Sequence, residues 1–163
     1  MAVTTVRVFL SWCHRDAKAK ATLLAELLPA LGLFTDLRVQ WWEDSHLTCG
    51  EQFAPAIFDR MDEADFGLLL VSTDYLVSSF IRKHELPRFA GPGADRGALP
   101  VRLTPLPPFG SEVDFGGLAE LQMFSLEGRA FTETTGPRRK RFGIDLAASI
   151  RRRALNLNGY RTL

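Results

Sequence analysis

Apolar and polar residues follow one another along the chain in blocks that predict strands and helices in turn. The apolar blocks have the four to eight residues of a strand, and FGLLLV, at 66–71, contains no polar residue. A run without polar positions is typical of a strand that is covered on both faces of its sheet. The predicted strands are Val6–Ser11, Leu37–Trp42, Phe66–Val71, Leu99–Leu103 and a short one at Leu121–Phe124.

Between these blocks, apolar residues recur at helical spacing. In the first helix the expected buried face is formed by Leu24, Leu28 and Leu31. Because strands and helices alternate, the sequence predicts an α/β fold, a flavodoxin-like parallel sheet of four to five strands flanked by helices. The expected helices run from Asp16 to Leu31, from Glu51 to Ala64, from Thr73 or Asp74 to about Leu86, and from Phe142 to Leu155.

Length and composition favour a single cytoplasmic domain. The chain has 163 residues, which suits one domain at 1–155 with a C-terminal tail or the start of a linker at 156–163. No apolar run reaches the roughly 18 residues of a membrane span, and the N-terminus lacks the layout of a signal peptide. Two cysteines and three scattered histidines have neither a disulfide pattern nor metal-ligand spacing. We therefore expect no membrane partner and no metal.

Charge is spread unevenly although the net charge is only +1. Residues 137–163 carry eight basic residues and one acid, so the remainder carries 12 basic and 18 acidic residues. This basic segment is either a site for nucleic acid or anionic lipid, or a solvated helix face that complements the acidic body. No aromatic residues are interleaved with the basic ones, which favours the solvated face over a nucleic-acid partner.

Polar and aromatic residues gather where the predicted strands end. Because ligands of open α/β sheets bind outside the carboxyl ends of the strands, these residues are candidates for a binding site. The candidates are Ser11, Trp12 and Arg15 after the first strand, Trp42 and Asp44 after the second, and Ser72 and Tyr75 after the third.

Each of these groups also has a purely structural interpretation. Arg15 and the first N–H groups of the helix suit a phosphate, but the same residues form an ordinary capped turn with Asp16. Trp41 and Trp42 point to opposite faces of a strand, so either one stacks on a ligand or both pack structurally. No GxGxxG or Walker A loop is present, and neither cysteine is paired with a base.

Glu85 is the candidate for chemistry because it breaks a local rule. Pro87 disfavours helical geometry at Leu86, so the helix is expected to end around His84 to Leu86. A carboxylate in the last turn faces the negative end of the helix dipole, at a cost of about 0.3–1 kcal/mol. Such a violation indicates a functional position. The alternative is a solvated side chain that pairs with Arg82 or Arg88.

Three segments together resemble a TIR domain of the bacterial type. VRVFLSWCHRD resembles the opening strand and turn of that family, and WEDSHLTCG resembles the exit of the second strand and the BB loop. LLLVSTDYLVSSFIRKHELP resembles the third strand and the helix that follows it. The three occur in the right order and spacing over Val6–Phe89. Phe80 stands where many relatives have Trp, and Cys49 where many have Pro.

The resemblance implies an NAD+ nucleosidase, because many TIR domains split the nicotinamide–ribose bond with a glutamate in that third helical segment. Glu85 is the matching residue. Phe80, Tyr75 and one Trp are then expected to shape the nicotinamide slot, with Ser11 and Arg15 near the phosphates. NAD+ is the substrate, the products are nicotinamide with ADP-ribose or a cyclised ADP-ribose, and no cofactor or metal is implied.

The resemblance also implies assembly. Self-association through the BB loop at 43–53, and a sensor domain or partner protein, are expected for a TIR domain of bacterial anti-phage immune signalling. The alternative is a non-catalytic TIR module that acts as an adaptor through protein–protein contacts.

Overall fold

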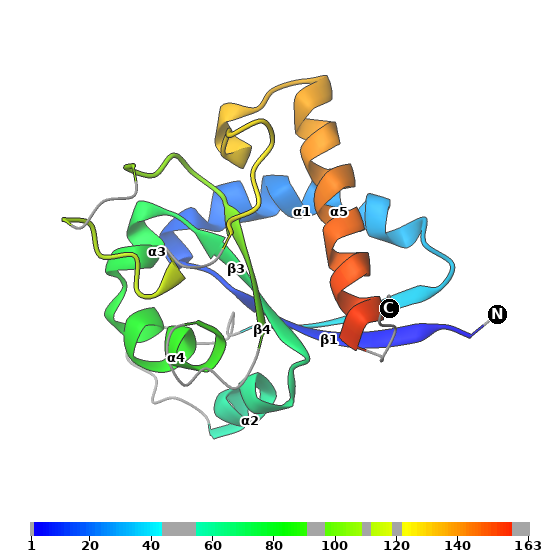
Figure 1. The fold of residues 1–163 in the computed structure, drawn as a ribbon, viewed down its shortest axis with the longest axis horizontal. Coiled ribbons are helices and arrows are strands. Elements are labelled where there is room, and N and C mark those ends of the chain that lie inside the picture. The colour runs from blue at the N-terminus through cyan, green and yellow to red at the C-terminus, as the bar shows by residue number, and fades with distance from the viewer. Residues whose placement is uncertain (1, 44–54, 91–96, 109–111, 119–121, 158–163) are drawn as a thin grey trace.

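Four parallel strands form the centre of the molecule in the order β2-β1-β3-β4 (Figure 1). The computed structural model describes residues 2–43, 55–90, 97–108, 112–118 and 122–157. This order confirms the flavodoxin-like α/β prediction. The strands are β1 (Thr4–Ser11), β2 (Leu37–Glu43), β3 (Phe66–Val71) and β4 (Gly97–Arg102).

Helices cover both faces of this sheet, with α1 and α5 on one side and α2 and α4 on the other (Figure 1). None of the helices in the described ranges is long and apolar enough to cross a membrane. The helices are α1 (Ala17–Gly32), α2 (Pro55–Glu63), α3 (Thr73–Val77), α4 (Leu86–Phe89) and α5 (Pro137–Leu157). The short helical turns are η1 (His14–Asp16), η2 (Ile81–Glu85) and η4 (Phe131–Glu133).

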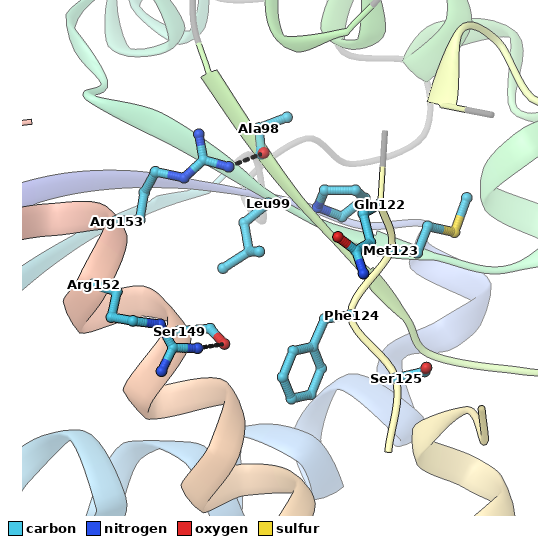
Figure 2. A pocket seen from close by; sticks show the side chains of 10 residues that line it. Ala98, Leu99, Gln122, Met123, Phe124, Ser125, Ser149, Arg152 and Arg153 are labelled. Carbon is cyan, nitrogen blue, oxygen red and sulfur yellow. Dashed lines mark hydrogen bonds between the residues drawn. The ribbon is translucent and has the colours of Figure 1, made fainter. Parts of the chain in front are cut away.

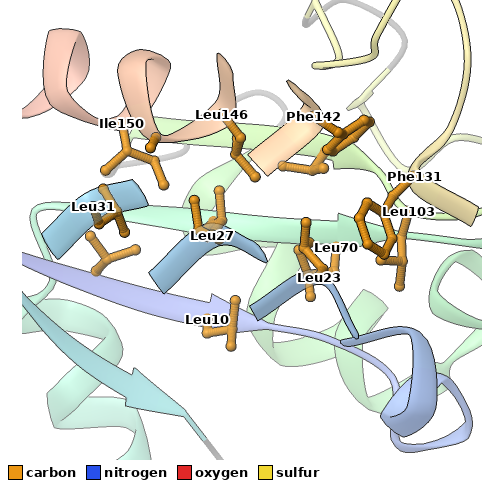
Figure 3. Close-up of a cluster of buried hydrophobic side chains, with 14 of the residues drawn as sticks. Leu10, Leu23, Leu27, Leu31, Leu70, Leu103, Phe131, Phe142, Leu146 and Ile150 are labelled. Carbon is orange, nitrogen blue, oxygen red and sulfur yellow. The ribbon is translucent and has the colours of Figure 1, made fainter. Parts of the chain in front are cut away.

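The first core, between the sheet and the pair α1 and α5, is built mainly from leucine, with phenylalanine and smaller numbers of other apolar residues (Figure 3). From α1 it takes Leu23, Leu27 and Leu31, whereas Leu28 is 44% exposed. The prediction was therefore correct for Leu31 and wrong for Leu28, and Leu24 is only partly buried. The helix has leucine at both sets of positions, so its sequence offers two apolar stripes, and packing against α5 and the sheet selects one.

The second core lies on the opposite face of the sheet. Because side chains alternate along a strand, Phe9 of β1 and Leu69 of β3 point here while their neighbours point to the first core. Phe9 stacks on Phe89 of α4 with ring centroids 5.7 Å apart. Tyr75 and Ile81, from the segment that leads to Glu85, are buried in the same core. This core therefore carries the elements that hold the catalytic candidate.

The C-terminal part of the chain closes the first core and one edge of the sheet. Helix α5 begins at Pro137, five residues before its predicted start, and packs along α1. In the predicted strand at 121–124, Leu121 lies outside the described residues, and Phe124 forms a parallel bridge to β4. Its N–H donates to Pro100 (2.8 Å) and its carbonyl accepts from Arg102 (2.9 Å). These bonds fix the segment beside the edge strand.

Candidate functional site

The carboxyl ends of the strands converge, as the sequence predicted. The hydroxyl groups of Ser11, at the end of β1, and Tyr75, after β3, are 2.8 Å apart in a buried hydrogen bond. The indole N–H of Trp12 donates to a carboxylate oxygen of Glu43, at the end of β2, over 2.9 Å. Two side-chain hydrogen bonds therefore link the end of β1 to Glu43 of β2 and to Tyr75 after β3.

Asp16 is a further polar residue at the strand ends, and it lies beside Ser72. It was predicted to cap α1 with its side chain, but it makes no such bond there. Its carboxylate instead accepts a short hydrogen bond from the hydroxyl of Ser72. That hydroxyl also accepts from the Tyr75 N–H (3.0 Å) and so caps α3. Burial raises the pKa of Asp16, and the Ser72 bond opposes that rise.

The sheet separates the candidate residues into two groups. Trp42 is the register partner of Phe9, and it shares the second-core face with Tyr75 and Phe80. Trp12 instead packs in the first core. The Lys20 ammonium lies 3.9 Å from the centre of the Trp12 ring and 2.5 Å from Glu43. One face of the Trp12 ring is therefore already occupied by a cation.

Sequence reasoning missed the ion pair between Lys20 and Glu43 beside the Trp12 ring. They are distant in sequence, and neither belongs to a motif that pairs them. Only the parallel pairing of β1 with β2 brings the end of β2 to the start of α1. No local signal in the sequence would have found this contact.

Arg15 lies at the outer rim of the strand ends. Its side chain is 79% exposed, and its guanidinium is 3.6 Å from the carboxylate of Asp74. With Lys18 and Arg139 it lines a cavity of about 370 Å³. Arg15 is thus accessible to an anion but is not part of the second core. Asp44, Cys49 and the rest of 44–53 fall outside the described residues, so the role of the BB loop stays a prediction.

The helical segment that carries Glu85 differs from the prediction. Helix α3 stops at Val77, since Ser78 is extended, and a second helical stretch then runs from 79 to 89. Its middle is the π-helical turn η2, in which the Leu86 N–H bonds to the Ile81 carbonyl. Leu86 keeps helical angles (φ −56°, ψ −42°) although Pro87 follows it. The predicted end of the helix at His84 to Leu86 was therefore wrong.

The physical reason lies in the π-helical turn. A wider turn shifts the hydrogen-bond ladder by one residue at the point where Pro87 has no N–H to give. The Arg88 guanidinium donates to the His84 carbonyl over 2.7 Å and supplies a donor to that part of the ladder. Glu85 is consequently inside a continuing helix and not in its last turn, so the dipole argument does not apply to it.

Glu85 is completely buried, with 0% exposure. The alternative of a solvated side chain is therefore wrong. Arg82 forms its ion pair with Asp114 (2.7 Å), and Arg88 forms one with Asp62 (3.1 Å). The neighbours of Glu85 at Ile81 and Leu86 are core residues of the second cluster. Burial takes this carboxyl group out of water, and a carboxyl group in an apolar core is a functional candidate.

A comparison with known families agrees with this architecture. A model of the TIR domain family matches residues 8–136, which is most of the chain. The protein therefore belongs to the TIR domain family. No curated protein matches the chain. The match ends where α5 begins, and α5 supplies Phe142, Leu146 and Ile150 to the first core.

Proposed function

We propose that this TIR domain is an NAD+ nucleosidase in which Glu85 is the catalytic carboxylate. The observation that carries the proposal is the complete burial of Glu85 on a π-helical turn within the segment that resembles the catalytic helix of NAD-cleaving TIR domains. Single π-helical turns occur frequently at functional sites. Inside a protein a carboxylate stabilises a developing positive charge more strongly than it does in water.

The reaction breaks the bond between the nicotinamide nitrogen and C1′ of the ribose. The bonding electron pair leaves with nicotinamide, which becomes neutral and needs no acid. The positive charge that develops on C1′ and the ring oxygen is stabilised by the Glu85 carboxylate. Water then bonds to C1′ and releases a proton, which gives ADP-ribose. Attack by a nitrogen of the substrate's own adenine instead gives a cyclised product.

The other candidate residues have distinct proposed roles. Trp42 and Phe80 are half-buried at the margin of the second core, which suits aromatic walls for the nicotinamide. Tyr75 is fully buried and bonded to Ser11, so we assign it to support of the slot. Exposed Arg15 is the residue we assign to the substrate phosphates.

The burial of Glu85 further supports a site that must open before substrate reaches it. We propose that self-association, with the BB loop at 43–53 as one contact, opens or completes the site. A sensor domain or partner protein would then trigger assembly in a bacterial immune response. If activity depends on assembly, the rate of NAD+ consumption should rise more than linearly with protein concentration.

The test is NAD+ consumption by the purified chain over a wide range of protein concentration, beside Glu85→Gln. Loss of the charge should lower turnover at least 10²–10³-fold, the usual effect of removing one charge-stabilising group. Glu63→Gln, at an exposed position of α2, is the matched control and should keep full turnover.

Turnover by Glu85→Gln within about twofold of the wild type would contradict the assignment of the catalytic residue. A chain that neither consumes nor binds NAD+ at any concentration, while it self-associates, would overturn the enzymatic proposal altogether. That result would leave a non-catalytic TIR interaction module.

A further inference from the structure

A groove lies at the edge of the sheet where α5 passes β4 (Figure 2). Its volume is about 520 Å³, within the ~300–1,000 Å³ range of small-molecule sites. Figure 2 shows Ser149, Arg152 and Arg153 of α5 on one side, Gln122 to Ser125 on the other, and Leu99 of β4 between them. The groove thus combines three segments that are far apart in sequence.

The lining of the groove is cationic. Arg152 and Arg153 both line it, and among the described residues that line it none is acidic. In the described part of the chain, no carboxylate lies within 4.0 Å of either guanidinium, whereas the neighbouring Arg151 is paired with Asp36. Two guanidinium groups that line the same groove attract an anion together. The described residues therefore give the groove a positive charge.

The two arginines are held in place but keep donors to spare. Arg153 donates to the Ala98 carbonyl over 2.8 Å, and Arg152 donates to the hydroxyl of Ser149 over 3.0 Å. Because a guanidinium has five N–H donors, each retains several for a ligand. A planar fork of this kind matches the oxygens of a phosphate. Arg152 and Ser149 together form a ready phosphate-binding pair.

The opposite side of the groove suits a flat ring. Phe124 is half-buried, and its backbone bonds to β4 fix it in place. Its ring meets Phe142 edge to face with centroids 5.1 Å apart, which sets its orientation. Exposed Gln122 adds an amide with both donor and acceptor groups. An aromatic surface with an amide beside it is suited to a nucleobase.

We propose that this groove binds a nucleotide, with the phosphate on Arg152 and Ser149 and the base against Phe124. The site is distinct from the proposed catalytic site, because Phe124 and Leu99 pack on the first core and Glu85 is flanked by residues of the second. It gives a role to the basic residues near the end of α5. The proposal does not depend on NAD+ cleavage.

The test is calorimetric titration of the intact chain with AMP, adenosine and inorganic phosphate. AMP should bind more tightly than adenosine or phosphate alone, since it offers both halves of the ligand. Arg152→Ala should weaken AMP binding about tenfold or more, the usual loss for a charged hydrogen bond. Arg141→Ala, an exposed arginine of the same helix outside the groove, should leave binding unchanged.

The position of binding is read from backbone amide shifts in NMR. AMP should move the signals of Leu99, Phe124 and Ser149, and Ser149→Ala should weaken AMP binding without changing that of adenosine. Equal affinity of Arg152→Ala and wild type for AMP, with both variants folded by thermal unfolding, would overturn the proposal. A loss of AMP affinity in Arg15→Ala, with none in Arg152→Ala, would also overturn the proposal, because it would place the phosphate at the strand ends.

A test of self-association distinguishes a nucleotide site from a contact between copies of the chain. Sedimentation of wild type and Arg152→Ala would show whether the groove is a contact between copies of the chain. If the variant dissociates and neither form binds AMP, the groove is a protein–protein contact and the nucleotide proposal is wrong.

Discussion

Gly143 sets the distance between α5 and α1, and its replacement tests the packing described above. A Cβ atom added at Gly143 would lie 2.8 Å from the Glu26 carbonyl oxygen and 2.9 Å from its carbonyl carbon. Two of its close neighbours are backbone atoms of a long helix, which cannot rotate away. Overpacking of this kind costs about 1–3 kcal/mol, and the backbone contacts place Gly143→Ala near the upper end.

The higher helix propensity of alanine offsets about 1 kcal/mol of this loss of stability. We therefore expect the free energy of unfolding to fall by about 2 kcal/mol. For a chain of this size, the midpoint of thermal unfolding should then fall by roughly 4–8 °C. Urea denaturation and calorimetry measure both quantities. Gly32→Ala is the control, since a Cβ there meets nothing within 4 Å and should not destabilise the chain. Equal effects of the two changes would refute the close approach of α5 to α1.

Three further predictions follow from burial and hydrogen bonding. Leu27→Ala should lower the free energy of unfolding by about 2–5 kcal/mol, whereas Leu28→Ala, at an exposed position, should lower it by less than about 0.5 kcal/mol. Urea denaturation measures both values, and the larger loss in Leu28→Ala would mean that the helix buries its other face. Tyr75→Phe removes the hydrogen-bond partner of the buried Ser11 hydroxyl and should lower the free energy of unfolding by about 1–3 kcal/mol. The double variant with Ser11→Ala should lose less stability than the sum of the two single variants, and strict additivity would contradict the hydrogen bond. The pKa of Asp16 is raised above 3.8 by burial, so the folded chain holds this proton more tightly than the unfolded chain. Its contribution to stability is therefore present at low pH and is lost as the pH rises through the folded pKa. Asp16→Asn should remove that part of the pH dependence, and identical pH profiles of unfolding for variant and wild type would contradict it.

Much of the candidate site could be identified from sequence because strand ends are local features. The residues after an apolar strand are known once the strand is known, and the rule for parallel sheets brings the ends together. Ser11 and Tyr75 meet in this way. The same reasoning could not separate Trp12 from Trp42, because the face to which each points depends on the register of β1 with β2 and on the turn after Ser11.

Glu85 shows where local rules fail. The sequence marked it as unusual, but for a reason that the structure removes, since the helix continues through Pro87. A π-helical turn depends on one shifted hydrogen bond and on the neighbours that pack around it, and no residue pattern in the segment specifies it. The burial of Glu85 likewise depends on the sheet and on helices from other parts of the chain.

The sequence by itself determined the order of strands and helices, the parallel sheet and the family resemblance, because these depend on periodicity and motif spacing over short stretches. Tertiary structure alone decided which leucines of α1 are buried, the path of the chain through Pro87, and the contact of Lys20 with Glu43. It also decided the groove between β4 and α5. Each of these is a contact between residues distant in sequence, whose free energy comes from packing and burial that no local pattern encodes.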